Sequence, residues 1–107
     1  MTTFDNRKDT AEKKFALDAE LEFKATARRN KLLGLWVAEK LGKSGAEAEA
    51  YAKSVVMADF EEAGDEDVFR KIRADFDAAT ISESDHVIRR TMDELMAKAI
   101  EQIKAGT

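Results

Sequence analysis

Proline is absent from this 107-residue sequence, and glycine occurs only five times. These two residue types break helices and build the tight turns between strands. A β-protein of this size needs more of them, and the strand-forming Val, Ile, Tyr, Phe and Trp are outnumbered here by Ala, Glu, Lys, Leu and Asp. The composition therefore predicts an all-α fold in a single domain.

The clearest long helical pattern runs from about Thr10 to Leu41 and ends at Gly42, which suits a helix C-cap. Two neighbouring rows of apolar residues follow it at steps of three or four. The rows are dense after Leu32, but before Phe23 they are thin and surrounded by charge. We therefore expect the second half of this helix to lie in a core and the first half to lie outside it.

Three further helices follow. A capping box of Ser44 and Glu47 opens the second helix, which is expected to run to about Ala63. Asp65 is expected to cap a short third helix, and a serine of the stretch 82–85 to cap the last one. Connections of about two to five residues predict an antiparallel four-helix bundle. The expected inward positions are Ala48, Tyr51, Ala52, Val55, Val56, Phe60, Val68, Phe69, Ile72, Phe76, Ile88, Met92, Leu95, Met96, Ala99 and Ile103.

Charge is abundant and unevenly distributed. The chain carries 22 acidic and 18 basic side chains, for a net charge of -4, which argues against general nucleic-acid binding. Residues 1–31 hold eight basic and six acidic side chains, whereas residues 32–107 hold ten and sixteen. The N-terminal arm and the rest of the chain are therefore electrostatically different. A charged helix with little apolar cover is expected to fray when free and to order on a partner.

Targeting and membrane signals are missing from the sequence. The first seven residues lack the apolar core of a signal peptide, and no apolar run approaches the roughly 20 residues that cross a bilayer. The absence of cysteine removes disulfides, thiolate metal sites and thiol catalysis. We expect a cytoplasmic protein without direct membrane insertion.

The sequence motifs that could indicate nucleotide binding, metal binding or catalysis are incomplete. Gly42-Lys43-Ser44 resembles the end of a phosphate-binding loop, but Val37 stands where that loop needs its first glycine, and a helix is expected to precede it. Residues 59–70 begin like a calcium loop and end at Arg70 instead of a bidentate glutamate. The single histidine, His86, has no partner for a zinc site or a catalytic triad. The sequence predicts no catalytic residue, no metal site and no enzyme.

Three other features of the sequence stand out, and two of them leave alternatives open. The run 28–31 (Arg-Arg-Asn-Lys) can contact phosphates or an acidic partner, but a solvated helix face is the commoner meaning. Gly34, inside a helix, suggests close approach by a neighbouring helix. Phe4 and Phe15 are large apolar groups in a charged segment, which either fold back on the bundle or anchor the arm in a groove on a partner.

Several stretches resemble one known family. The most specific is residues 23–36, Phe-Lys-Ala-x-Ala-Arg-Arg-Asn-Lys-Leu-Leu-Gly-Leu-Trp. The shorter ones are Phe4-Asp5-x-Arg7, Lys14-Phe15-Ala16-x-Asp18, Tyr51-Ala52-Lys53-x-Val55-Val56, Asp59-Phe60-Glu61, Gly64-Asp65-Glu66-Asp67-Val68 and Ile88-Arg89-Arg90-x-Met92-Asp93-Glu94. Over nearly its whole length the chain resembles the zeta subunit, the ATPase inhibitor of alphaproteobacterial F-type ATP synthases.

The resemblance implies a four-helix bundle, residues 19–107, with a mobile N-terminal inhibitory arm, residues 1–18. It implies that the arm enters a catalytic interface between the alpha and beta subunits, near the central stalk, and blocks rotation in the hydrolysis direction. The protein would then associate with the membrane-bound synthase through its catalytic head. The implied partner-binding residues are Phe4, Asp5, Arg7, Lys14, Phe15 and Asp18.

The same family is linked to binding of ATP or ADP by the bundle, with no contacts that map onto residues here, so no cofactor is predicted. Two rival classes of function remain beside the inhibitor. One is a nucleotide-sensing helical bundle, and the other is a general helical adaptor unrelated to the synthase.

Overall fold

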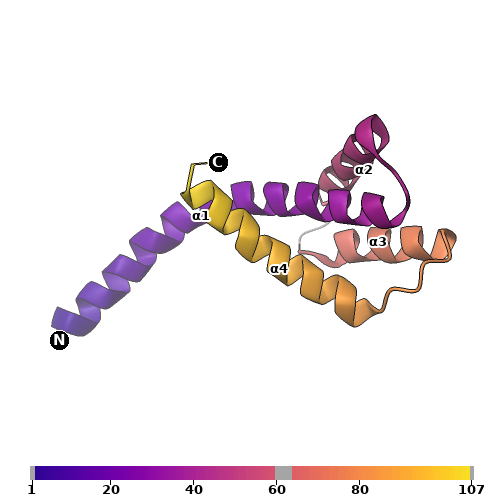
Figure 1. The fold of residues 1–107 in the computed structure, drawn as a ribbon. Helices are drawn as coiled ribbons and strands as arrows, with labels where there is room; N and C mark the ends of the chain where they lie inside the picture. The colour runs from indigo at the N-terminus through magenta and orange to yellow at the C-terminus, as the bar shows by residue number, and fades with distance from the viewer. Residues whose placement is uncertain (1, 60–63, 107) are drawn as a thin grey trace.

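The structure, a computed structural model, describes residues 2–59 and 64–106, and for residues 2–18 it describes the backbone alone. Four helices account for most of that part of the chain: α1 (Thr2–Lys40), α2 (Gly45–Ala58), α3 (Glu66–Ala78) and α4 (Asp85–Lys104). Helix α1 packs against α2 and α4, and α3 packs against the same two helices. The predicted all-α fold and four-helix bundle are confirmed (Figure 1).

Helix α1 begins at Thr2, eight residues before Thr10, where the clear helical pattern of the sequence begins. Nothing in residues 2–9 stops a helix, because this stretch holds neither proline nor glycine. Figure 1 shows the first turns of α1 running beyond the other three helices. The flexibility expected for residues 1–18 stays a prediction, as does the boundary after residue 18.

The predicted end of α1 is confirmed in detail. Gly42 has a φ of +78°, its N–H donates to the Glu39 carbonyl at 3.1 Å, and the Lys43 N–H donates to the Ala38 carbonyl at 2.8 Å. This pair of bonds is a Schellman motif, which needs the left-handed conformation that glycine adopts at no steric cost. Gly42 and Lys43 therefore end a helix and build no phosphate loop.

Two predicted caps form differently from expectation. Ser44 occupies the N-cap position of α2 with extended backbone, but its side chain makes no capping hydrogen bond. Gly45 follows it with a φ of +56°, and this irregular first turn accounts for the missing bond. Asp65 occupies the N-cap position of α3, again without a capping bond. Only Ser84 caps as predicted, accepting from the Val87 N–H at 3.1 Å.

Helix α2 ends at Ala58, five residues before the predicted end at Ala63. Asp59 follows as its C-cap, and the expected burial of Phe60 lies outside the described residues.

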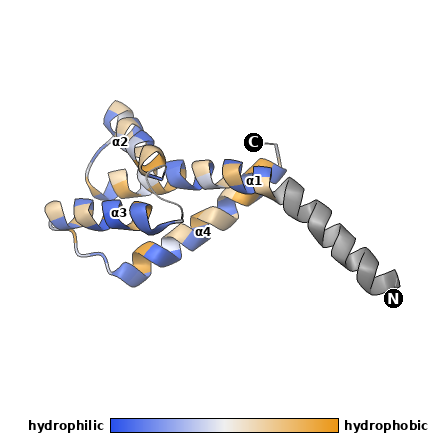
Figure 2. Cartoon of the chain, turned by 180° about the vertical axis from the view of Figure 1, so that it is seen from behind, coloured by the Kyte–Doolittle hydropathy of each residue, from blue (hydrophilic) through white to orange (hydrophobic). Residues whose placement is uncertain are grey.

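The core lies where the apolar rows of the four helices meet. Trp36 of α1 meets Phe76 of α3 edge to face, with ring centroids 5.9 Å apart. Figure 2 shows hydrophobic and hydrophilic residues alternating along each helix of the bundle, as amphipathic packing requires. The buried cluster consists of Leu33, Val37, Val55, Val68, Ile72, Phe76, Ile88 and Met92.

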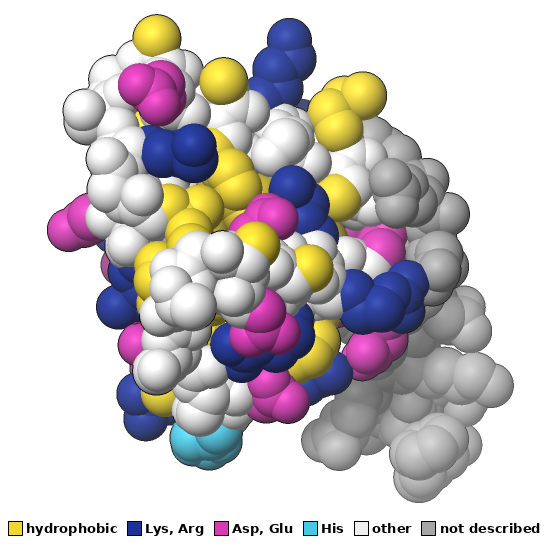
Figure 3. All heavy atoms as spheres, turned by 90° about the vertical axis from the view of Figure 1, so that its right-hand side faces the viewer, with side chains coloured by type: hydrophobic (Ala, Val, Ile, Leu, Met, Phe, Trp, Pro, Cys, Tyr) yellow, Lys and Arg dark blue, Asp and Glu magenta, His cyan; other side chains and the backbone are white. Residues whose placement is uncertain are grey.

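The surface carries both charge signs. Figure 3, seen from the right-hand side of Figure 1, shows basic and acidic side chains interspersed, and the histidine lies on the outside at one edge. His86 is exposed in the first turn of α4, as expected for a surface residue.

Candidate functional site

The six predicted partner-binding residues, Phe4, Asp5, Arg7, Lys14, Phe15 and Asp18, all belong to α1. Their side chains lie outside the described part of the structure, so their contacts remain untested. The helical backbone nevertheless fixes their register, at about 100° per residue. Positions 4 and 15 are about three turns apart and share one face. Positions 7, 14 and 18 lie within about 80° of that face, and position 5 lies about 100° away.

The arm is continuous with a helix that is anchored in the bundle by a buried cation. Arg29 is 1% exposed, and its guanidinium donates to both carboxylate oxygens of Asp65, at 2.7 and 3.4 Å. Its Nε donates to the Asn30 side-chain oxygen at 2.8 Å, and Asn30 is itself 1% exposed. A buried charge must be paired and hydrogen-bonded to be tolerated, and Arg29 is both.

This burial corrects the expectation that the run 28–31 is a solvated helix face. Lys31 is exposed and Arg28 is half-buried, but Arg29 and Asn30 belong to the interior. A usable signal was present in the sequence, because position 29 lies in one series with Ala25, Leu33 and Val37 at steps of four, and all three of these are buried.

Asp59, at the end of α2, meets the same cluster. Burial raises the pKa of its carboxyl above the ordinary value. A hydrogen bond from the Asn30 side chain opposes this effect and lowers the pKa, the Asp67 carboxylate raises it, and nearby Arg29 lowers it. Asp59 at the end of α2 and Asp65 at the start of α3 therefore both bond to side chains of α1.

Gly34 provides the close approach that the sequence suggested. A Cβ at this position would lie 2.5 Å from the Cα of Ala52 in α2 and 3.1 Å from its Cβ. Side chains larger than hydrogen do not fit between these backbones, so α1 and α2 cross at the point where glycine meets alanine.

A second polar cluster joins α2 to α3. The Tyr51 hydroxyl donates to Asp75 Oδ2 at 2.6 Å, and Lys71 Nζ donates to the same oxygen at 3.1 Å. Burial, with the hydrogen bond to Asp75, raises the pKa of Tyr51, which keeps the hydroxyl protonated. Within this cluster Tyr51 acts as a hydrogen-bond donor that holds the two helices together.

Phe23 lies on an apolar row of the long helix, in the half of the predicted helix that was expected to lie outside the core, and 66% of it is exposed. Among the described residues, the large hydrophobic side chains that are exposed are Phe23 and Met57, at 58%. The sequence pattern assigned Phe23 to the right helix face, but α1 leaves the other helices before that face is covered at this position.

Within residues 2–59 and 64–106, no helix combines the length and apolar character that crossing a bilayer requires. In that same part of the chain, no three His, Asp or Glu side chains gather closely enough to hold a metal ion.

Comparison with known proteins identifies the family. The sequence model of the family described as ATPase inhibitor subunit zeta matches residues 1–102. No match is found among the curated proteins. One solved structure, described as a solution NMR structure, is 54% identical in sequence and superimposes with a TM-score of 0.72. The alignment covers 81% of this chain and 99% of that one. The chain therefore belongs to the family of the ATPase inhibitor subunit zeta.

Proposed function

We propose that this chain inhibits ATP hydrolysis by the F-type ATP synthase, and that it does so by inserting residues 1–18 into a catalytic interface between an alpha and a beta subunit, near the central stalk. The observation that carries the proposal is the family match, which includes the arm as well as the bundle because it begins at residue 1.

The fold supports different roles for the two halves of α1. Its C-terminal half is fixed in the bundle by the apolar core and by the Arg29–Asp65 pair. Its N-terminal half continues the same helix from Thr2. A bundle attached to the arm in this way tethers it and raises its effective concentration at the partner once either part has bound.

The register of the arm suits docking in a groove. Positions 4 and 15 share one helix face, so Phe4 and Phe15 together provide two apolar anchors about three turns apart. Burial of each ring contributes about 1.5–3 kcal/mol. Arg7 and Lys14, beside this face, pair with acidic groups of the partner. Ordering of the segment opposes binding by about 2–5 kcal/mol, which these contacts and the tether offset.

Deletion of residues 1–18 tests the proposal. The intact protein is expected to inhibit ATP hydrolysis by the purified synthase from the matching source, and the deleted protein is expected to lose that inhibition. Circular dichroism of the deleted protein checks that the remaining helices still form. Equal inhibition by the two proteins contradicts the insertion mechanism, and absence of inhibition by the intact protein contradicts the function.

A further inference from the structure

A continuous groove follows α1 where this helix leaves the bundle. It consists of three adjoining hollows, the larger two of about 420 and 510 Å³, which share Val56 of α2. Helix α1 forms one wall from Phe23 to Lys31, α2 forms the other, and the C-terminal end of α4 closes one end with Ile103. We call this surface the α1–α2 groove. Its lining includes Phe23, Lys24, Arg28, Lys31, Lys53 and Val56.

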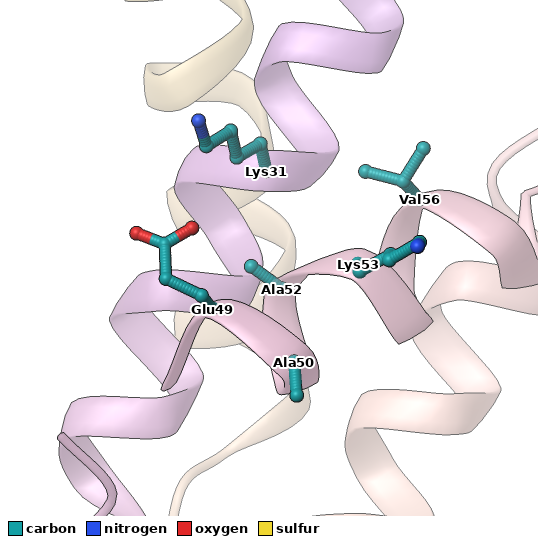
Figure 4. Close-up of a pocket in the computed structure, with 6 residues that line it drawn as sticks. All are labelled: Lys31, Glu49, Ala50, Ala52, Lys53 and Val56. Atoms are coloured by element: carbon teal, nitrogen blue, oxygen red, sulfur yellow. The ribbon is translucent and has the colours of Figure 1, made fainter. Parts of the chain in front are cut away.

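The floor of the groove is apolar and open to solvent. Figure 4 shows one of the hollows, which is lined by Lys31 of α1 and by Ala52, Lys53 and Val56 of α2. Phe23, 66% exposed, stands at the rim of the other two. An aromatic ring left in water beside a concave apolar floor is typical of a protein-binding surface.

The charge of the groove is opposite to that of the whole chain. Four basic residues line it (Lys24, Arg28, Lys31 and Lys53) and two acidic ones (Glu49 and Asp59), although the chain carries a net charge of -4.

Most of these cations are available to a partner. Lys24 pairs with Glu20 at 3.4 Å on a well-exposed surface, where such a pair contributes little. Arg28 donates to the neutral Gln102 at 3.3 Å. Lys31 and Lys53 form no ion pair with any residue that the structure describes. The groove therefore attracts an acidic ligand.

We propose that the α1–α2 groove binds an acidic amphipathic helix of the synthase head, as a second contact beside the inserted arm; this rests on the proposed function for the identity of the partner. The groove begins five residues after Asp18 on the same helix, so a partner that holds the arm is brought directly to it. Between Phe23 and Lys31 the wall is about 12 Å long, enough for about two turns of a bound helix. Its apolar side chains enter the hollows at spacings of three or four, while its carboxylates meet the lysines.

Shape and charge favour this occupant over a membrane. A bilayer surface is flat and contacts a row of projecting cations, whereas here the apolar floor is recessed between the two helices. Separate hollows that adjoin one another accept separate side chains, as they do when a helix lies in a groove.

Binding of full-length variants to the immobilised synthase head, measured by surface plasmon resonance, tests the proposal. Phe23→Ala and the double charge reversal Lys31→Glu/Lys53→Glu are each expected to weaken binding about tenfold, as loss of an aromatic contact or of charge complementarity does at an interface. Phe23 and both lysines are exposed, so these variants should keep the fold. The matched controls, Met57→Ala and Lys98→Glu, remove an exposed hydrophobic and an exposed cation outside the groove and are expected to bind like the unmodified protein.

A photoreactive phenylalanine analogue at position 23 identifies the occupant. The expected cross-link joins it to an acidic helical segment of the head. Unchanged affinity of both groove variants, in a protein that still binds and inhibits, overturns the groove while leaving the proposed function intact. Failure of the unmodified protein to bind the head overturns both. Binding to anionic phospholipid vesicles or to ATP that the groove variants lose, with affinity for the head unchanged, assigns the groove to a membrane or a nucleotide and also overturns the proposal.

Discussion

The guanidinium of Arg29 in α1 lies against the carboxylate of Asp65, with Nη2 and Oδ1 2.7 Å apart, and this pair connects the long helix to the start of α3. The arginine side chain is 2% exposed and the aspartate side chain 50%. The pair therefore consists of an interior cation and a carboxylate at the surface, and loss of the carboxylate leaves the buried cation without a counter-charge.

Asp65→Ala is accordingly expected to lower the free energy of unfolding by about 2–3 kcal/mol, because Arg29 keeps its burial and loses its counter-charge. Urea denaturation followed by circular dichroism measures the change. Asp65→Ser distinguishes this role from helix capping, since serine is a good N-cap residue. Equal stability of Asp65→Ser and the unmodified protein would show that capping dominates.

Replacing both partners completes the test. The double variant Arg29→Met/Asp65→Ala exchanges the interior cation for an apolar side chain of similar length. It is expected to be more stable than Asp65→Ala alone, because no unpaired charge remains in the interior. A double variant that is less stable than Asp65→Ala would contradict this account of the pair.

Gly34→Ala is expected to destabilise the bundle by about 1–3 kcal/mol, as overpacking of a fitted contact does. The added Cβ would lie 2.5 Å from the Ala52 Cα, a backbone atom that side-chain rotation cannot move away. For this reason, Ala52→Gly should not restore the stability of Gly34→Ala, although it removes the contact with the Ala52 Cβ. Thermal unfolding of the two single variants and the double variant measures the effect. Full recovery of the thermal stability in the double variant would show that the added Cβ clashes with the Cβ of Ala52 alone.

The fold was largely predictable from the sequence because its determinants are local. The apolar stripe of α4, the Schellman end at Gly42 and the close contact of Gly34 each depend on residue types at fixed spacing. The extent of α1 was underestimated, since the sequence pattern reports apolar periodicity, which residues 2–9 lack, although they contain no residue that breaks a helix.

The polar interior was harder to predict for a physical reason. Arg29 is tolerated inside because Asp65, 36 positions along the chain, reaches it, and no local pattern reports such a pairing. The same carboxylate looked like a helix cap, which is the commoner use of aspartate before a helix. For the arm, the sequence and the family resemblance supplied the candidate residues, and the helix supplied their register.

Asp59→Asn is expected to remove a pH dependence of stability. Burial raises the pKa of Asp59 in the folded protein, so between the ordinary carboxyl pKa of about 3.9 and the raised value the folded state holds more protons than the unfolded state. This contribution to stability is fully present below the lower value and is lost as the pH rises through the raised one. The free energy of unfolding of Asp59→Asn, minus that of the unmodified protein, should therefore increase as the pH rises from acidic to neutral.

Urea midpoints measured for both proteins between about pH 3.5 and pH 7 test the sign. Asn30, which hydrogen-bonds the Asp59 carboxyl, should continue to bond the amide of the variant. A difference between the two proteins that stays constant across the range, or that grows as the pH falls, contradicts the assignment of the raised pKa to Asp59.

The register of the arm makes a prediction that is specific to one face of the helix. Positions 4 and 15 share a face of α1, whereas positions 6 and 9 lie roughly opposite, about 140–160° away from position 4. If the arm inserts as a helix, Phe4→Ala/Phe15→Ala should weaken inhibition of ATP hydrolysis at least tenfold, since burial of two rings is lost. Asn6→Ala/Asp9→Ala should leave the inhibition constant within about threefold of that of the unmodified protein. Alanine preserves the helix, and these positions face away from the groove on the synthase in which the arm is proposed to dock. Titration of each protein against the synthase gives the inhibition constants. Equal losses in both double variants would mean that the arm inserts in another conformation, and a loss confined to positions 6 and 9 would place the contact on the opposite face.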